Sequence, residues 1–179
     1  MQKIRFLLIL MTLICLYGKS KAQDVALKTN GLYWLTTTTN LDVEVALSNK
    51  WTVELLGAYN PWTFSNDKKL RLWLAQPEAK YWLCEKFEGH FFGVHLHGGQ
   101  FYSTLANKRR DGYLAGAGIS YGYDWIITPH FNIEAEIGIG YAYLWYKESD
   151  CISCLRDVVN RSKNYFGPTK AAVSFVYLF

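Results

Sequence analysis

The chain has almost no surplus charge outside its first 22 residues. All four surplus positive charges belong to Lys3, Arg5, Lys19 and Lys21, and the rest of the chain holds 15 basic and 15 acidic side chains. A nearly neutral chain releases few counterions from a polyanion, so the sequence predicts no nucleic-acid partner. With 50% hydrophobic and only 19% charged residues, the 179-residue chain also does not fit a disordered tail protein. Its length fits one folded domain.

Only one long apolar run occurs, and it is too short to cross a bilayer as a helix. Phe6 to Tyr17 spans about 12 residues, whereas a spanning helix needs roughly 18 to 20. Basic residues precede this run, and Ser20-Lys21-Ala22 follows it as a small-x-small cleavage site. The sequence therefore predicts a signal peptide at residues 1–22 and one mature domain at 23–179.

Helical periodicity is also lacking, and an alternation of period two takes its place. In the segment Phe131 to Tyr146 one face is wholly apolar, and the other holds polar or small residues. Trp51 to Asn60 and Tyr113 to Trp125 repeat the pattern. These segments are longer than the five or six residues usual in soluble strands, and strands of about 9 to 11 residues span a membrane when they tilt. Because only closed barrels cross a bilayer with strands, we expect a barrel.

Eight strands are expected over the mature chain. We place them near residues 25–36, 40–48, 51–61, 70–83, 90–102, 112–126, 131–146 and 169–179. Short links alternate with longer ones, as periplasmic turns and external loops do in outer-membrane barrels. The longer links are Trp62 to Lys69, Ser103 to Asp111 and Lys147 to Pro168, while the first external link, Thr37 to Thr39, is tight. The predicted fold class is all-β, an eight-stranded antiparallel outer-membrane β-barrel.

Charged side chains fall on the face of the predicted strands that points into the barrel. They include Glu54, Glu78, Lys80, His95, His97, Glu134 and Glu136, with Asp42, Glu44 and Gln76 on the same faces. An eight-stranded barrel is filled by side chains, and buried charges must pair, so we predict an interior polar network. The alternative is a general acid/base set or a zinc site, in which Glu134 or Glu136 completes a shell begun by the two histidines.

The four cysteines carry no zinc-ribbon pattern, because only one CxxC pair occurs. Cys151 and Cys154 lie in the longest expected external loop, where an exported protein keeps disulfides. We therefore predict a Cys151–Cys154 disulfide. Cys84 is left as an odd thiol, expected to be half-buried at the periplasmic rim. Cys15 is an apolar residue of the leader, since Ile14 before it does not suit a lipoprotein signal.

Two resemblances add to this pattern. The chain ends in Tyr177-Leu178-Phe179, which resembles the aromatic-x-Phe signal by which the insertion machinery recognises Gram-negative barrels. The stretches 76–82 (QPEAKYW) and 93–99 (GVHLHGG) resemble a family of small outer-membrane barrels catalogued as a domain of unknown function. That resemblance implies an eight-stranded barrel, often encoded beside fimbrial assembly components in Gram-negative bacteria of the gut. It brings no catalytic residue and no cofactor.

The functional expectation is a non-enzymatic scaffold or interaction protein of the outer membrane. Its expected partners are outer-membrane lipid, the barrel-insertion machinery and fimbrial or other envelope proteins. The alternative is a small membrane-embedded lipid A hydrolase or acyltransferase. Such an enzyme needs a histidine, a serine and an acid at the lipid-facing rim, whereas His95, His97 and Ser120 face the lumen in the expected register. A pore conflicts with the small number of strands.

Overall fold

The computed structural model describes residues 23–63, 69–104, 109–149 and 159–179. The expected signal peptide and the cysteine pair Cys151/Cys154 lie outside these residues, so both stay predictions. The elements are β1 (Val25–Asn30), α2 (Gly31–Leu35), β2 (Thr39–Ala46), β3 (Trp51–Thr63), β4 (Lys69–Trp82), β5 (Gly89–Ser103), β6 (Arg109–Thr128), β7 (Phe131–Ser149) and β8 (Val159–Leu178).

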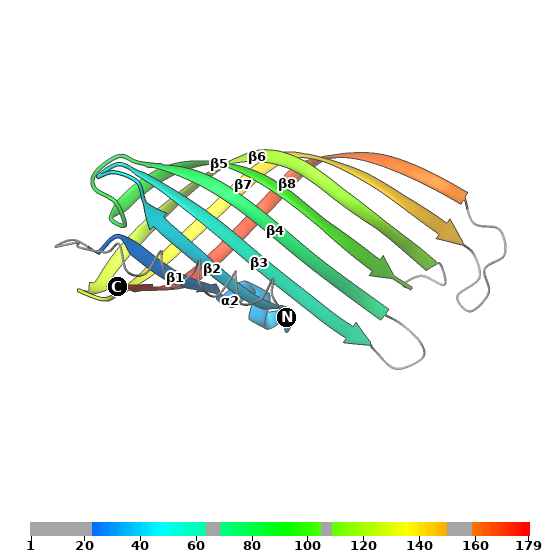
Figure 1. Cartoon of the computed structure of the whole chain (residues 1–179), viewed down its shortest axis with the longest axis horizontal. Helices are drawn as coiled ribbons and strands as arrows, with labels where there is room; N and C mark the ends of the chain where they lie inside the picture. Colours follow the sequence, from blue (N-terminus) through cyan, green and yellow to red (C-terminus); the bar gives the residue numbers. More distant parts are fainter. Residues whose placement is uncertain (1–22, 64–68, 105–108, 150–158) are drawn as a thin grey trace, which may run out of the picture.

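The eight strands form one closed barrel in chain order, with β1 paired to β8 (Figure 1). Every neighbouring pair is antiparallel, and Ala26 lies opposite Leu178 where the ring closes. The predicted fold class is thus confirmed. Among the residues that the structure describes, no helix is long and apolar enough to cross a membrane.

The period-two pattern separates an apolar exterior from a polar interior. On the outside, Val94, Ile119 and Ile137 are each about 60% exposed. On the inside, Glu134 and Glu136 are at most 5% exposed. This is the reverse of a water-soluble protein, and it fits a surface that faces lipid, where each strand turns alternate residues to the bilayer and to the lumen.

The two ends of the barrel differ, and we name them by their connections. At the turn end, residues 47–50, 83–88 and 129–130 link the strands, and the C-terminus lies beside them (Figure 1). The other end, the loop end, carries α2 and the strand ends that flank residues 64–68, 105–108 and 150–158. Trp82 and Phe91 pack with their ring centroids 4.7 Å apart and close the lumen at the turn end.

Cys84 lies in the 83–88 turn and is exposed, so the expectation of a half-buried thiol was wrong. The turn buries Phe87 instead, whose backbone adopts a positive φ of 61°. Phe87 fills the mouth of the barrel against Trp82 with ring centroids 6.0 Å apart. The neighbouring cysteine is thereby left facing outward.

The first strand is shorter than expected, because β1 ends at Asn30 and α2 follows where a strand to residue 36 was predicted. The Asn30 side chain explains this end. Its oxygen accepts hydrogen bonds from the backbone N–H groups of Leu32 (3.0 Å) and Val173 (3.2 Å). Its amide nitrogen donates to the carbonyl of Ala171 (3.0 Å). One side chain therefore caps α2 and also pairs β8 where the backbone of β1 has turned away.

The last two strands are longer than expected, because β7 continues to Ser149 and β8 begins at Val159. The expected loop from Lys147 to Pro168 is therefore largely strand, with Glu148 opposite Val159. The segment 159–164 (VNRSKN) gives no apolar alternation. Where a strand has left the bilayer, neither face needs apolar side chains, so the pattern that identifies membrane strands is lost.

We predict that Asn30→Ala lowers the free energy of unfolding by about 1–3 kcal/mol, because it leaves backbone groups of β8 without their partner in an apolar setting. Urea titration of the refolded protein in lipid vesicles measures this. Asn164→Ala is the control, since its amide is exposed and accepts a hydrogen bond from a side chain, the Tyr141 hydroxyl, and not from the backbone of a neighbouring strand. Equal effects of the two substitutions would contradict the capping role.

Candidate functional site

A cluster of ion pairs occupies the middle of the lumen, and Lys80 of β4 lies at its centre. The Lys80 ammonium is 2.5 Å from a Glu54 carboxylate oxygen and 2.8 Å from Glu134. Glu136 lies at 3.4 Å and Glu44 at 3.6 Å. All five side chains are at most 2% exposed, so these charges are removed from water and depend on one another.

Lys28 of β1 forms a second centre of the cluster. Its ammonium is 2.6 Å from Glu134 and 3.3 Å from Glu54, and it also contacts Glu44. Lys28 was not predicted from the sequence, although it alternates with Ala26 and Asn30 on the inward face of β1. The β1 segment is too short for its alternation to stand out.

Lys170 of β8 is the third cation, and sequence analysis missed it too. Its ammonium is 2.8 Å from Glu54 and 2.9 Å from Glu136, and it contacts Glu78. Glu78 in turn accepts a hydrogen bond from the Ser120 hydroxyl. Lys170 is the second residue of the strand expected at 169–179, so few neighbours in that strand showed which way its side chain points.

The two predicted histidines lie in the same lumen, toward the loop end of the cluster. The His95 Nε2 is 2.9 Å from the Thr169 hydroxyl, and the ring centroids of His95 and His97 are 5.6 Å apart. Glycines make room for them: a Cβ atom at Gly138 would come within 2.9 Å of the His95 ring. The inward glycines of β6 and β7 thus leave space for larger side chains that reach across the narrow lumen.

The arrangement does not favour a zinc site. Among the described residues, the group with metal-ligand spacing is Glu54, Glu134 and Glu136, whose oxygens lie within 4.8 Å of one another, and it includes neither histidine. The Lys80 ammonium lies within 3.4 Å of all three carboxylates. Lys80 therefore takes the place that a cation would need, and the chemistry here is charge compensation by the chain itself.

Above the charged cluster, toward the loop end, the lumen becomes apolar. A cavity of about 360 Å³ opens there with His97 among its lining residues. Its walls are mainly apolar or aromatic, and Lys163 and Thr169 add polar groups; the apolar or aromatic side chains include Leu72, Leu74, Leu114, Leu144, Tyr165 and Pro168. The lumen thus holds a mainly apolar cavity toward the loop end and a charged cluster, or plug, below it. An ion crossing the barrel would have to pass both.

The two residues of the expected insertion signal lie on the outside of the barrel at the turn end. Tyr177 packs edge-on against Phe131 and Phe179, with ring centroids 5.0 Å and 4.8 Å apart. Both side chains are partly exposed, at 36% and 62%. This aromatic group has the position of an interfacial girdle, where rings lie at the boundary between hydrocarbon and water.

A family model described as "Protein of unknown function (DUF3575)" matches residues 6–179. The chain belongs to this family. The family resemblance expected from the sequence is thereby confirmed. No curated protein matches the chain. Among solved structures, the NMR solution structure of the E. coli outer membrane protein W is similar at 12% sequence identity, with 88% of this chain and 98% of that chain covered and a TM-score of 0.48.

We predict that Lys80→Met lowers the free energy of unfolding by about 3–5 kcal/mol, because it leaves buried carboxylates uncompensated. The double variant Lys80→Met/Glu134→Gln should recover part of this loss, since it removes an unpaired charge as well. Urea unfolding followed by tryptophan fluorescence measures both. Lys163→Met, at an exposed lysine of β8, is the matched control, and an equally large effect there would refute the prediction.

Proposed function

We propose that the protein is a non-enzymatic scaffold of the Gram-negative outer membrane, which anchors itself by a plugged barrel and presents its loop end to envelope proteins. The observation that carries this proposal is the filled lumen. Ion pairs join β1, β2, β3, β4, β7 and β8 across the inside, and the side chains that make them are buried. A barrel filled in this way holds a position in the membrane and leaves little room for transport.

The extended wall formed by β6, β7 and β8 supports a role in display. Pairing in this wall continues to Arg109 opposite Ser149 and to Glu148 opposite Val159, far beyond the short β1 (Figure 1). Glu148 ties the three strands together, since its carboxylate is 2.9 Å from Arg110 Nε and 3.3 Å from Arg161 Nε. The wall is thus a braced support for the connections at the loop end.

The orientation follows from the connections. Short turns of bacterial outer-membrane barrels face the periplasm, and longer loops face outward. The loop end is then the cell surface, and Tyr177 and Phe179 face the periplasmic side, from which the insertion machinery acts. Fimbrial or other envelope proteins are the proposed partners of the loop end, in keeping with the expectation drawn from the family resemblance.

The positions of His95 and Ser120 do not favour a lipid A enzyme. Its required groups would have to reach the lipid-facing rim, and His95 and Ser120 are both inside the barrel at 0% and 5% exposure. The Ser120 hydroxyl is hydrogen-bonded to Glu78, and the His95 ring is hydrogen-bonded to Thr169. These contacts favour a packing role for both side chains.

A plugged barrel should not conduct ions. In planar bilayers we expect purified protein to give no stepwise conductance at neutral pH, because charged side chains fill the lumen and an apolar chamber adjoins them. Glu54→Ala/Lys80→Ala, which empties part of the plug, is the comparison. Discrete open channels formed by the unaltered chain would contradict the proposal.

Site-specific crosslinking tests the partner. A photoreactive residue in place of Val159, at the tip of the extended wall, should capture a fimbrial or envelope subunit in intact cells. The same residue in place of Leu83, in an exposed turn at the other end, should not capture that subunit. Capture from Leu83 alone, or no capture from the wall with the barrel folded and abundant, would refute the display role.

A further inference from the structure

Two consecutive outward rows of side chains mark the boundary of the bilayer at the loop end. Residues directly opposite each other on paired strands share a face, so the register defines each row. The lower row runs through Tyr59, Trp73, Gln100, Tyr113 and Trp145 on β3 to β7. The upper row runs through Arg71, Tyr102, Asp111, Lys147 and Asn160 on β4 to β8. An aromatic row under a charged row is where lipid headgroups begin.

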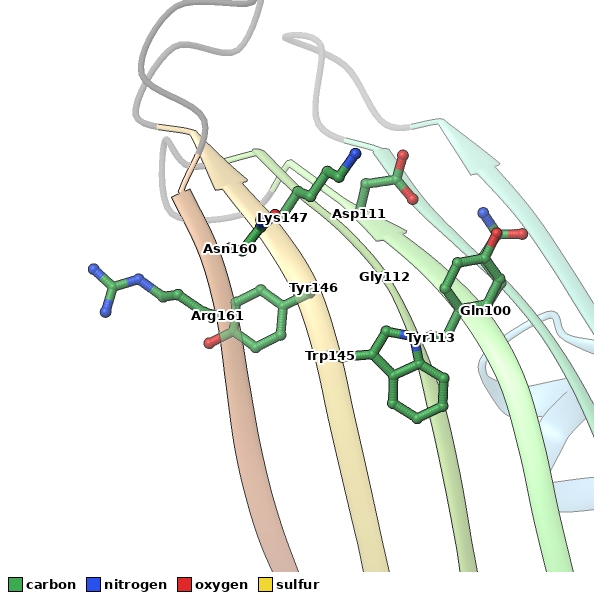
Figure 2. Close-up of a pocket in the computed structure, with 9 residues that line it drawn as sticks. All are labelled: Gln100, Asp111, Gly112, Tyr113, Trp145, Tyr146, Lys147, Asn160 and Arg161. Atoms are coloured by element: carbon green, nitrogen blue, oxygen red, sulfur yellow. The ribbon is translucent and has the colours of Figure 1, made fainter.

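A pocket of about 340 Å³ lies across these two rows on β5 to β8 (Figure 2). Tyr113 and Trp145 line its aromatic side, with ring centroids 6.1 Å apart and planes 25° apart. Asp111, Lys147, Asn160 and Arg161 line its polar side, and Gly112 and Tyr146 complete the lining. The volume is at the lower end of the roughly 300–1,000 Å³ usual for ligand pockets, which suits a small headgroup.

Gln100 completes the pocket from β5, and its position is set by a neighbour. The Gln100 carboxamide oxygen accepts a hydrogen bond from the indole N–H of Trp73 at 3.4 Å. The carboxamide is therefore kept beside the aromatic rings, within the lower row. Figure 2 shows Gln100 close to Tyr113, with Lys147 and Asp111 together at the upper rim.

This combination of groups suits a sugar ring. Aromatic faces pack against the C–H faces of a pyranose, and carboxylate, amide and ammonium groups hydrogen-bond to its hydroxyls. A bare acyl chain offers no polar group to which Asp111 or Lys147 could hydrogen-bond. We propose that this pocket binds the saccharide headgroup of a glycolipid in the surrounding outer leaflet.

The positions beneath the pocket favour a lipid over a free sugar. Directly below Gln100 and Tyr113, the outward residues are Gly98 and Ala115, which lie opposite each other on β5 and β6. Ala117 follows on β6. Small side chains here leave space along the barrel wall for an acyl chain that descends from the bound headgroup. The proposal does not depend on the scaffold role, since it concerns the lipid-facing side of the wall at the bilayer boundary and not the tip of the wall.

Native mass spectrometry of the purified full chain tests this. The protein is equilibrated in mixed micelles with lipopolysaccharide of short-chain type, with phosphatidylglycerol as an anionic lipid without a sugar, or with the deacylated saccharide alone. We expect the lipopolysaccharide to be retained in preference to phosphatidylglycerol. Trp145→Leu and Lys147→Met should each weaken retention about tenfold, the effect of one well-placed contact.

Trp51→Leu, in the aromatic row at the turn end, is the matched control and should retain lipopolysaccharide like the unaltered chain. Circular dichroism and heat-modified gel mobility confirm that each variant is folded. Retention that is unchanged by Trp145→Leu and Lys147→Met, or equal for phosphatidylglycerol, would overturn the proposal. Equal affinity for the deacylated saccharide, lost in the same variants, would overturn the assignment to a membrane lipid.

Discussion

The interior ion-pair cluster is the interaction on which the rest of this barrel depends. The outward side chains lie in a setting as apolar as themselves, so the hydrophobic effect adds little to hold the strands around a lumen once they are in lipid. Lys28, Lys80 and Lys170 take over that role by joining carboxylates across the ring. The cluster reaches β1 and β8, where the seam of the barrel is paired over only Ala26 to Asn30.

The seam explains why the barrel is uneven. Because β1 is short, the Asn30 side chain replaces backbone pairing at Ala171 and Val173, while β6, β7 and β8 continue as a wall toward the loop end. Inside that wall, a cavity with mainly apolar walls lies above His97 and the charged cluster lies below it. Outside it, the same strands carry aromatic and then polar rows. The longest strands therefore hold both the display surface and the pocket at the bilayer boundary.

Sequence predicts those parts of the barrel in which the bilayer imposes a pattern. The segment from Phe131 to Tyr143 alternates because lipid lies on one side and the lumen on the other, and the structure places β7 there. Residues 159–168 were expected as loop and are strand: Val159 and Asn160 lie at the polar boundary, where this constraint weakens, and a register shift opposite Gly138 and Ile139 breaks the alternation of β8 near Pro168. The α2 helix was missed for another reason: Asn30 ends β1 through contacts with β8 that lie about 140 residues away in the chain.

The acidic half of the candidate site could be predicted from the sequence, and most of the basic half could not. Acidic residues of long strands, such as Glu54 and Glu134, can be assigned to the lumen because the alternation along the strand shows which residues point inward. Two of the three lysines that balance them come from a strand of six residues and from the misplaced start of β8. Which carboxylate meets which lysine depends on the closure of the ring, a property of the whole chain that no local pattern carries.

NMR of the lysine ammonium groups, with the protein labelled with ¹⁵N in lipid nanodiscs, tests the central claim most directly. The ammonium groups of Lys28, Lys80 and Lys170 should give separate signals that exchange slowly with water at neutral pH, because they are buried and bonded to carboxylates. Exposed Lys163 should give no such signal. Fast exchange at all three buried lysines would mean a water-filled lumen and would contradict the account.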